Sequence, residues 1–548
     1  MNHRPSEFSD DFLGELKEDL VCRRVGRGMK RLEECEHLLS SFNPKQKNAA
    51  IFTGYLAQWV DVGFRRPRLV KDVLGRFPKN IRAQLPLRDY VHLRMAEGMV
   101  AMSQQATKEA IQNFDFIRSL TTEIDDKELF SVVNFWKGRC LRMRGEYDEA
   151  LIYTIEGRDL ALQSGHEPMA AVMRVLESWL YFQKENSKEA ERILREAEAV
   201  LRKTDDYVTL GNIYSSYGRI ALRQGRYQHA IDHFVAAIAE YKKRDPGHRN
   251  VARSLNNLAY AKRLIALQLR RKIDADVARR RKPRTAGAPK SQNARVQYRS
   301  RFEQLRQEAF AALGEAEEIY RQHPNHHGIG NVHLNYGNLY LDNGDVERAD
   351  HEAETAFELG EQKKDNILMG RARLLQCMIE NARVDEEIGD GAEPSSHARL
   401  AQDCAHDAVE LSKHTQDRRL LAHAYIWQGL TSCNSFFENL ESARQSYDLA
   451  ATFSKGDYPD STWEDMQALK AKIFRKGTVD PKLRAWSQGS VGDKTFQQMT
   501  EEFAELIIPK VWEREDRKIS RVAARLSVSP KKVRRILTRV GRRKPSGG

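Results

Sequence analysis

The fold is decided by residues 214–237, which read Tyr214-Ser-Ser-Tyr-Gly-Arg-Ile-Ala-Leu-Arg-Gln-Gly-Arg-Tyr-Gln-His-Ala-Ile-Asp-His-Phe-Val-Ala-Ala237. Small residues stand at Gly218 and Ala230, with bulky residues between and after them. A small side chain lets two helices approach closely, and the bulky side chains fill the space beside the contact. The stretch therefore predicts two helices packed as a hairpin.

The same pair of small residues recurs at a fixed period. Gly98, Gly138, Ser178 and Gly218 are spaced forty residues apart, and an alanine follows each of them twelve residues later, at positions 110, 150, 190 and 230. Self-similarity at a fixed period is typical of solenoids built from one repeated structural unit. We therefore predict a stack of helical hairpins.

The hairpin stretch resembles the tetratricopeptide repeat. The matching residues are Tyr214, Tyr217 and Gly218 in the first helix, Gly225 and Tyr227 at the turn, and Ala230, Phe234 and Ala237 in the second helix. Other copies lie around Gly138 and Gly337. The resemblance implies an all-α, tetratricopeptide-like solenoid of roughly eight to ten helix pairs over residues 45–476. A helical segment, residues 1–44, precedes it.

Two of the repeats are interrupted. A basic insertion occupies residues 262–301, and an acidic insertion occupies residues 381–397. The stretch 279–290 is too basic and too poor in apolar residues to pack, so we expect it to be mobile. Insertions into repeats usually emerge as loops on one face of a solenoid.

The composition is that of a folded protein, since 41% of the 548 residues are apolar and 30% are charged. No run of eighteen apolar residues is present, so we expect no membrane-spanning helix. The first residues lack the apolar core of a signal peptide. The six cysteines show no CxxC spacing, which argues against a disulfide framework or a zinc module. These features predict a cytoplasmic protein that does not associate with a membrane.

The net charge of +13 is unevenly distributed. Residues 517–548 contain twelve Lys or Arg and no Asp or Glu, and residues 262–301 contain fourteen basic residues against two acidic ones. Each stretch carries +12, and subtracting both from +13 leaves −11 for the rest of the chain. We therefore expect only these two stretches to attract a polyanion strongly.

The C-terminal region reads as a linker followed by three helices. Residues 477–494 have the glycine, proline and serine content of a linker. Within residues 495–541, Ser529 is placed to cap the last helix and Pro530 to occupy its first position. Two helices joined by a short turn, the second of them basic, are typical of a DNA-binding helix-turn-helix. A basic tail, residues 542–548, follows.

This three-helix unit resembles the Fis-type helix-turn-helix found in bacterial enhancer-binding activators. The matching residues are Ala523, Leu526, Val528, Val533, Leu537 and the closing Arg539-Val-Gly541. The turn usually carries glycine where this chain has Ser527, and a left-handed backbone there would cost about 1 kcal/mol. No GxxxxGK[ST] loop occurs in the sequence, so the ATPase activity of those activators is not implied.

A DNA-binding role would use the basic side chains of the last helix and the tail. We expect contacts to base edges or phosphates from Ser529, Lys531, Lys532, Arg534, Arg535, Arg539, Arg542, Arg543 and Lys544. The alternative is that the unit only caps the solenoid and leaves its basic face in solvent. The absence of acidic residues from 517–548 argues against that alternative, because a solvated helix face normally mixes both signs.

Tetratricopeptide arrays generally bind peptides or protein segments along a concave face formed by their first helices. By this resemblance the groove-facing residues include Arg139, Arg219, Arg253, Asn256 and Asn338. An asparagine amide can pair with both the N–H and the C=O of a bound backbone. The alternative for each of them is an ordinary exposed helix position. No arrangement of catalytic residues or metal ligands stands out, so we expect no enzymatic activity, cofactor or metal.

The resulting hypothesis is a bacterial, cytoplasmic regulator of transcription. Its solenoid would bind a protein or peptide partner, and its C-terminal unit would dock on duplex DNA. Fis-type domains act as dimers, which implies a homodimer on a two-fold site with half-sites about one helical turn apart. The alternative is a non-enzymatic scaffold whose basic segments bind acidic protein or RNA.

Overall fold

In a computed structural model the chain forms two compact units, unit 1 (Met1–Leu469) and unit 2 (Lys470–Gly548). The structure describes residues 7–64, 68–280, 292–323, 328–387, 395–454, 460–477, 486 and 492–543. Every regular element in these ranges is a helix, and they contain no strand. The prediction of an all-α fold is therefore confirmed. No helix in the same ranges has both the length and the apolar character needed to cross a membrane.

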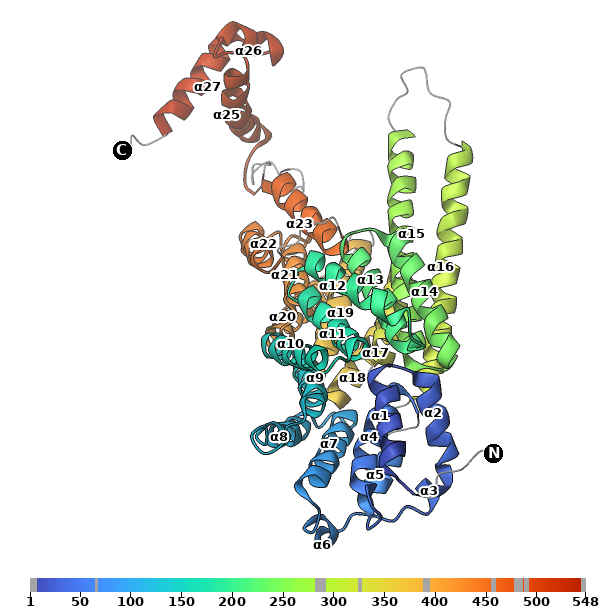
Figure 1. Ribbon diagram of the computed structural model, residues 1–548. Coiled ribbons are helices and arrows are strands. Elements are labelled where there is room, and N and C mark those ends of the chain that lie inside the picture. The colour runs from blue at the N-terminus through green and yellow to red at the C-terminus, as the bar shows by residue number, and fades with distance from the viewer. Residues whose placement is uncertain are drawn as a thin grey trace. The chain divides into compact units, whose positions relative to one another are not determined.

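Most of unit 1 is a stack of helical hairpins (Figure 1). Eight hairpins occur in the described residues, and each consists of a first and a second helix. This is the predicted tetratricopeptide-like solenoid. The helix pairs are α7 (Leu87–Ser103) and α8 (Thr107–Arg118), α9 (Lys127–Arg144) and α10 (Tyr147–Gln163), α11 (Glu167–Gln183) and α12 (Ser187–Leu201), α13 (Tyr207–Arg223) and α14 (Tyr227–Arg244), α15 (Arg249–Arg280) and α16 (Gln292–Arg321), α17 (Gly328–Asp342) and α18 (Val346–Lys363), α19 (Asn366–Glu387) and α20 (Ser395–Lys413), and α21 (Arg418–Ser432) and α22 (Leu440–Phe453).

Further helices flank the hairpins. Those before the first hairpin are α1 (Asp10–Val21), α2 (Val25–Glu34), α3 (Glu36–Ser40), α4 (Ala49–Val62), α5 (Arg68–Gly75) and α6 (Lys79–Arg82), and α23 (Ser461–Gly477) follows the last one. The N-terminal helices are attached to the start of α13. Arg23 Nε donates to Asp206 Oδ2 at 2.7 Å, and the carboxylate of Asp205 accepts the backbone N–H groups of Val25 and Gly26 at 2.6 and 2.7 Å.

The recurring small residues lie where the two helices of a hairpin touch. A Cβ atom at Gly218 would lie 2.6 Å from the ring of Phe234, and one at Gly98 would lie 2.7 Å from another phenylalanine ring. At Ser178, the equivalent position in the third hairpin, the hydroxyl donates to the carbonyl of Ala190 at 2.8 Å. The predicted close approach of the paired helices is therefore confirmed.

The turns inside the hairpins also repeat every forty residues. Gly145 and Gly225 have φ angles of 84° and 69°, and Gln105 and Glu185 have φ angles of 66° and 63° at the equivalent positions. Glycine adopts this left-handed conformation without strain, whereas a residue with a Cβ does not. The turn geometry is thus a property of the repeat, and two copies keep it without glycine.

The basic and acidic insertions continue into the helices that flank them. Residues 262–280 and 292–301 lengthen α15 and α16, which form the long green hairpin of Figure 1. In the acidic insertion, residues 381–387 belong to α19 and residues 395–397 to α20. Residues 281–291, which make up most of the stretch expected to be mobile, lie outside the described residues. So do most of the predicted linker and the end of the basic tail.

Unit 1 returns on itself, because hairpins far apart in sequence touch. The backbone N–H of Tyr147 donates to Gln416 Oε1 at 3.5 Å, and a Cβ atom at Gly145 would lie 3.9 Å from the Cβ of Gln416. The hydroxyl groups of Tyr260 and Ser461 are 3.3 Å apart. Segments that are far apart in sequence are therefore brought into contact.

Unit 2 contains three helices with a small core of their own. They are α25 (Phe496–Arg514), α26 (Ile519–Arg525) and α27 (Pro530–Arg543). Thr495 and Gln498 form a capping box at the start of α25. The buried side chains of the core are Ile508, Val522, Ala523, Val533 and Ile536.

Candidate functional site

Three first helices of unit 1 each carry two arginines about one helical turn apart. Residues three or four positions apart lie on the same face of a helix. We name the six side chains the arginine cluster, and the sides of the helices that carry them the inner face of unit 1. The members are Arg139 and Arg142 on α9, Arg219 and Arg223 on α13, and Arg249 and Arg253 on α15.

The three helices direct these arginines toward one another. The charge of Arg253 lowers the pKa of both Arg142 and Arg219, so guanidinium groups from all three helices lie within electrostatic reach. Arg142, Arg219 and Arg253 are only partly exposed. Residues that are far apart in sequence thus share one positively charged surface.

Most of the cluster has no acidic partner. Arg139 Nη1 lies 2.7 Å from Asp61 Oδ2. Within the described ranges no carboxylate forms an ion pair with the other members, Arg142, Arg219, Arg223, Arg249 and Arg253. Buried or partly buried charges are ordinarily paired, because leaving one unpaired in a low-dielectric environment is costly.

The hydrogen bonds of the central arginines are also incomplete. Arg219 Nη2 donates to Ser216 Oγ at 3.0 Å, and Arg253 Nη2 donates to Asn212 Oδ1 at 3.0 Å. The Nε atoms of Arg219 and Arg253 are buried and have no acceptor in the part of the chain that the structure describes. Two buried donors, one on α13 and one on α15, therefore lack an acceptor within the described residues.

Burial and mutual repulsion both weaken the charged state of the cluster. Burial, together with the smaller effect of the charge of Arg253, lowers the pKa of Arg219 to about 9. Burial also lowers the pKa of Arg142 and of Arg223 to about 10, with a second contribution from Arg139 at Arg142. The arginines remain charged at neutral pH, and a bound anion would oppose both effects.

Several members of the cluster lie over aromatic rings. The pairs are Arg139 over Trp136 at 4.3 Å, Arg142 over Trp179 at 5.0 Å and Arg223 over Phe182 at 3.7 Å from the ring centroid. A cation above an aromatic face is attracted by the ring and held in place. Because the guanidinium is planar, stacking through its face leaves the N–H donors at its edge free for a carboxylate or phosphate.

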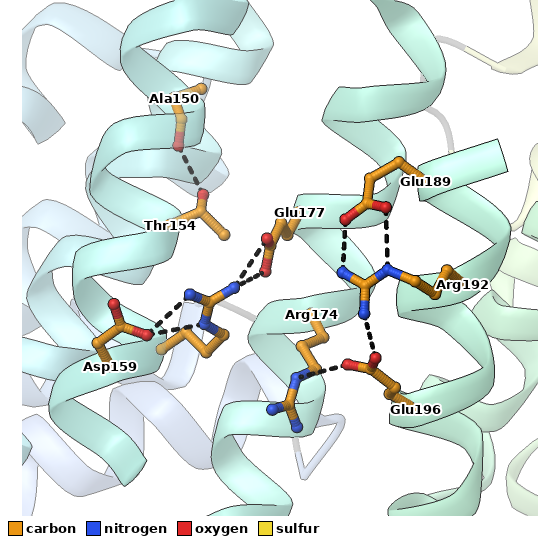
Figure 2. Close-up of polar contacts among 9 residues, drawn as sticks. Ala150, Thr154, Asp159, Arg174, Glu177, Glu189, Arg192 and Glu196 are labelled. Carbon is orange, nitrogen blue, oxygen red and sulfur yellow. Dashed lines mark hydrogen bonds and ion pairs between the residues drawn. The ribbon is translucent and has the colours of Figure 1, made fainter. Parts of the chain in front are cut away.

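Some arginines elsewhere in unit 1 are paired with carboxylates. Figure 2 shows Arg192 on α12 between the carboxylates of Glu189 and Glu196, and Arg174 on α11 directed at Glu196, 3.7 Å away. Arg192 and its partners are exposed or partly exposed. The arginine cluster differs from these pairs in its shortage of acidic partners.

The two predicted groove asparagines contact other protein groups. Asn256 on α15 is 8% exposed, and its side-chain oxygen accepts from the amide of Asn335 on α17 at 2.9 Å. Asn338 donates to the carbonyl of Leu334 in its own helix at 2.7 Å. The amide pair Asn256–Asn335 extends the polar inner face from α15 to α17.

Half of the arginine cluster coincides with residues that the sequence analysis predicts to line a groove. Arg139, Arg219 and Arg253 were predicted as groove residues, and the structure places them together. Arg142, Arg223 and Arg249 were missed. The available signal was a second arginine three or four positions from the first, on three first helices. The arginine cluster lies in neither of the two basic stretches, 262–301 and 517–548.

In unit 2, two of the predicted DNA contacts are engaged with acidic residues of α25. Arg535 Nη2 lies 2.5 Å from Glu501, and Arg539 Nε lies 3.1 Å from Glu505. Both arginines are largely exposed, with side-chain exposures of 59% and 51%. These arginines form ion pairs with α25. To bind a phosphate, they would have to rearrange or share their N–H donors.

Three other basic residues of α27 are unpaired. Within the described residues, no ion pair reaches Lys531, Lys532 or Arg534. Ser529 caps the helix, since its hydroxyl accepts the backbone N–H of Lys532 at 3.2 Å. Predicted contacts whose side chains lie outside the described residues are Arg542, Arg543 and Lys544.

The turn between α26 and α27 has the expected left-handed residue. Ser527 has a φ angle of 52°, in the region that glycine adopts most easily. Its backbone N–H donates to the carbonyl of Ala524 at 3.3 Å. The chain therefore makes this turn with serine in the place where the resembling family carries glycine.

Metal and disulfide chemistry find no support in the described part of the chain. It contains no group of three or more His, Cys, Asp or Glu side chains arranged to hold a metal ion. No disulfide joins the cysteines there.

No family model matches the chain, and no curated protein matches it. Solved structures with similar helical stacking include the apo form of the quorum sensor NprR from B. thuringiensis (TM-score 0.39, 11% identity, covering 81% of this chain and 97% of that one). Others are a Rap protein complexed with competence and sporulation factor (0.47, 12%, 85% and 98%) and a human IFIT1 dimer with m7Gppp-AAAA (0.45, 12%, 86% and 96%). At this level the similarity says nothing about the ligand or activity of this chain.

Proposed function

We propose that this protein is a non-enzymatic regulator that binds an extended protein segment on the inner face of unit 1 and duplex DNA through unit 2. The observation that carries the first half is the pair of buried Nε donors of Arg219 and Arg253, which have no acceptor in the described residues. An unsatisfied buried donor costs about 1–3 kcal/mol. Such groups in native proteins are usually satisfied by water or a ligand.

The length of the polar inner face favours an extended ligand. Beyond the arginine cluster, the amide pair Asn256–Asn335 links α15 to α17. Arg371 on α19 donates to Asn331 on α17 at 3.2 Å. Amide groups can pair with both the N–H and the C=O of a peptide backbone, whereas a small anion needs only the arginines. A peptide or protein segment would use both.

The DNA-binding half of the proposal is supported by α27. Lys531, Lys532 and Arg534 lie on a helix that follows a short turn, and no carboxylate in the described residues neutralises them. An unpaired basic helix face suits a DNA major groove, where phosphates and base edges both accept hydrogen bonds. A location in the cytoplasm with access to DNA is part of this proposal.

The DNA-binding half can be tested with the full-length protein. A randomised duplex library would first identify a bound sequence, and fluorescence anisotropy would then measure affinity across a salt series. The variant Lys531→Ala/Lys532→Ala/Arg534→Ala should bind at least ten-fold more weakly. Its slope of log affinity against log salt should fall by about 3, since each phosphate contact contributes about 1.

A matched control replaces Arg192 and Arg195 by alanine, because both are exposed on α12 of unit 1. This control should bind DNA as the unmodified protein does, with circular dichroism confirming that all three proteins are folded. Absence of duplex binding at low salt would contradict the proposal. Light scattering of the DNA complex measures stoichiometry, and two chains per site would support the homodimer.

A second candidate function is a scaffold that binds RNA or acidic protein. It is favoured by the hairpin of α15 and α16, where Tyr298 is 39% exposed beside the exposed Arg299. An exposed aromatic beside basic residues suits stacking with single-stranded bases. Tighter binding of a uridine oligonucleotide than of selected duplex DNA, abolished by Tyr298→Ala/Arg299→Ala, would favour this function.

A further inference from the structure

We infer that the segment bound on the inner face of unit 1 is an acidic peptide, whose Asp or Glu carboxylates are held by Arg142, Arg219 and Arg253. This rests on the proposed function, in which the inner face binds a protein segment, and it specifies the chemistry of that segment. Three observations carry it: unpaired charge, the edges of the guanidinium groups, and the acidic residues around the cluster.

The arginine cluster gathers positive charge that is not neutralised. Arg142, Arg219 and Arg253 come from three different helices and repel one another, and in the described residues none has a carboxylate partner. A fold gains nothing from bringing three unpaired cations together, so the arrangement calls for an anion of matching multiplicity. Two or three carboxylates on one peptide meet that requirement.

The geometry of the guanidinium groups favours a carboxylate as their ligand. Arg142 lies over the ring of Trp179, so one face of its guanidinium is covered. Arg223 lies over the ring of Phe182 and donates from Nη1 to the carbonyl of Phe182 at 2.7 Å, so part of its edge is occupied. A guanidinium edge presents parallel N–H groups that match the two oxygens of a carboxylate. Nucleic acid bases would instead need uncovered aromatic faces on which to stack. Arg142 and Arg223 each cover one face of the Trp179 and Phe182 rings, which leaves less aromatic surface for stacking.

Two acidic residues lie beside the arginine cluster. Asp61 lies 2.7 Å from Arg139, and Asp417 lies 3.3 Å from Arg371. The charge of Asp417 also acts on Arg223, which places this carboxylate beside the cluster. A nucleic acid carries a phosphate at every nucleotide and would bring some of them against these acids. A peptide can place acidic residues opposite the arginines and neutral or basic residues elsewhere.

The experiment begins with a phage-displayed library of random dodecamers selected on the full-length protein. Enriched peptides should carry at least two Asp or Glu residues close together. The strongest would be synthesised with a fluorescent label, together with an analogue in which Asp and Glu are replaced by Asn and Gln. The analogue should bind at least ten-fold more weakly, and binding of the acidic peptide should weaken with salt.

Variants locate the binding to the cluster. Arg219→Gln/Arg253→Gln should weaken the acidic peptide at least thirty-fold, and Arg142→Gln alone should weaken it several-fold. Both variants should melt at a higher temperature than the unmodified protein, because they remove unpaired charge. A merely structural role would lower the melting temperature instead. Arg192→Gln/Arg195→Gln, on exposed α12, is the control and should leave affinity unchanged.

The outcomes separate this inference from the proposed function. Enriched peptides without acidic residues, or acidic peptides bound equally well by the Arg219/Arg253 variant, would overturn the inference and leave the segment-binding function standing. A library that yields no enriched peptide would overturn both. A uridine oligonucleotide that binds tighter than the acidic peptide, and loses affinity in the same variant, would reassign the inner face to nucleic acid.

Discussion

At the scale of single residues, His92 gives stability a defined dependence on pH. Its side chain on α7 is 4% exposed, and burial lowers its pKa to about 4. The unfolded chain takes up this proton near pH 6.5, so between about pH 6.5 and 4 the unfolded state binds more protons. Stability is therefore full above that window and falls as the pH drops through it, by about 1.4 kcal/mol per pH unit.

Replacing His92 by leucine should remove this dependence. Between pH 7 and pH 5 the free energy of unfolding should fall by about 2 kcal/mol less in His92→Leu than in the unmodified protein. Urea denaturation at the two pH values measures the difference. His414→Leu, at an exposed position, is the control for loss of an imidazole. An equal change in both variants would show that burial of His92 is not the cause.

Two ion pairs of opposite exposure allow a second test. Arg23 and Asp206 are 8% and 1% exposed, whereas Lys47 and Asp10 are 70% and 72% exposed. Asp206→Asn keeps the shape of the side chain and leaves the buried guanidinium without its counter-charge, so we expect a loss of about 3 kcal/mol. Asp10→Asn should have little effect on stability, because solvent screens an exposed ion pair. Similar losses from chemical denaturation of both variants would contradict this reasoning.

Single residues also show where sequence reasoning stops. The left-handed turn at Ser527 was predictable, because turn chemistry is local. The pairing of Arg23 with Asp206 was not, since it joins residues 183 positions apart. The same holds for the arginine cluster, in which each arginine has an ordinary helical context. Only the stacking of three hairpins brings these arginines close together.

At the scale of elements, the packing of helix pairs follows from the small residues. A Cβ at Gly218 would press against the ring of Phe234, 2.6 Å away, whereas one at Gly14 in α1 would meet nothing within 4 Å. Gly218→Ala should destabilise unit 1 by about 1–3 kcal/mol through overpacking, despite the better helix propensity of alanine. Gly14→Ala should stabilise it by about 0.5–1 kcal/mol.

Thermal unfolding followed by circular dichroism measures both glycine variants. The sign is decisive here, because the same chemical change is made twice in helical positions. Stabilisation by both variants would mean that α13 and α14 can move apart at no cost. Destabilisation by Gly14→Ala would mean that α1 is constrained in a way that its open surroundings do not explain.

The elements themselves were largely predictable from the sequence. A period of forty residues marked by small side chains was sufficient for the helical hairpins, because each hairpin packs by the same local rule. The arrangement of elements that are distant in sequence could be predicted less well from the sequence. Nothing in the repeat pattern indicates that residues 145–147 meet Gln416, since superhelical rise and curvature depend on small rotations between neighbouring hairpins that add up over the solenoid.

At the scale of the whole molecule, the net charge does not show how the charged residues are distributed in space. Outside the two basic stretches the chain carries −11, yet its inner face gathers unpaired arginines. Acidic residues such as Glu189 form ion pairs with basic residues outside the cluster, such as Arg192, and few lie beside the cluster. A sum over sequence segments cannot reveal this, because the segregation of charge depends on which side of each helix faces inward.

The return of unit 1 on itself, in which the turn between α9 and α10 meets Gln416, can be tested by cross-linking. A Cβ at Gly145 would lie 3.9 Å from that of Gln416, close to the mean Cβ separation across a disulfide. Gly145→Cys/Gln416→Cys should therefore form a disulfide under mild oxidation, detected as a mobility shift on a non-reducing gel. The control Gly165→Cys/Gln416→Cys uses another turn glycine, which has no neighbour within 4 Å, and should not cross-link. Cross-linking of both pairs, or of neither, would contradict the closed arrangement, because the contact depends on the accumulated curvature of all the hairpins between these residues.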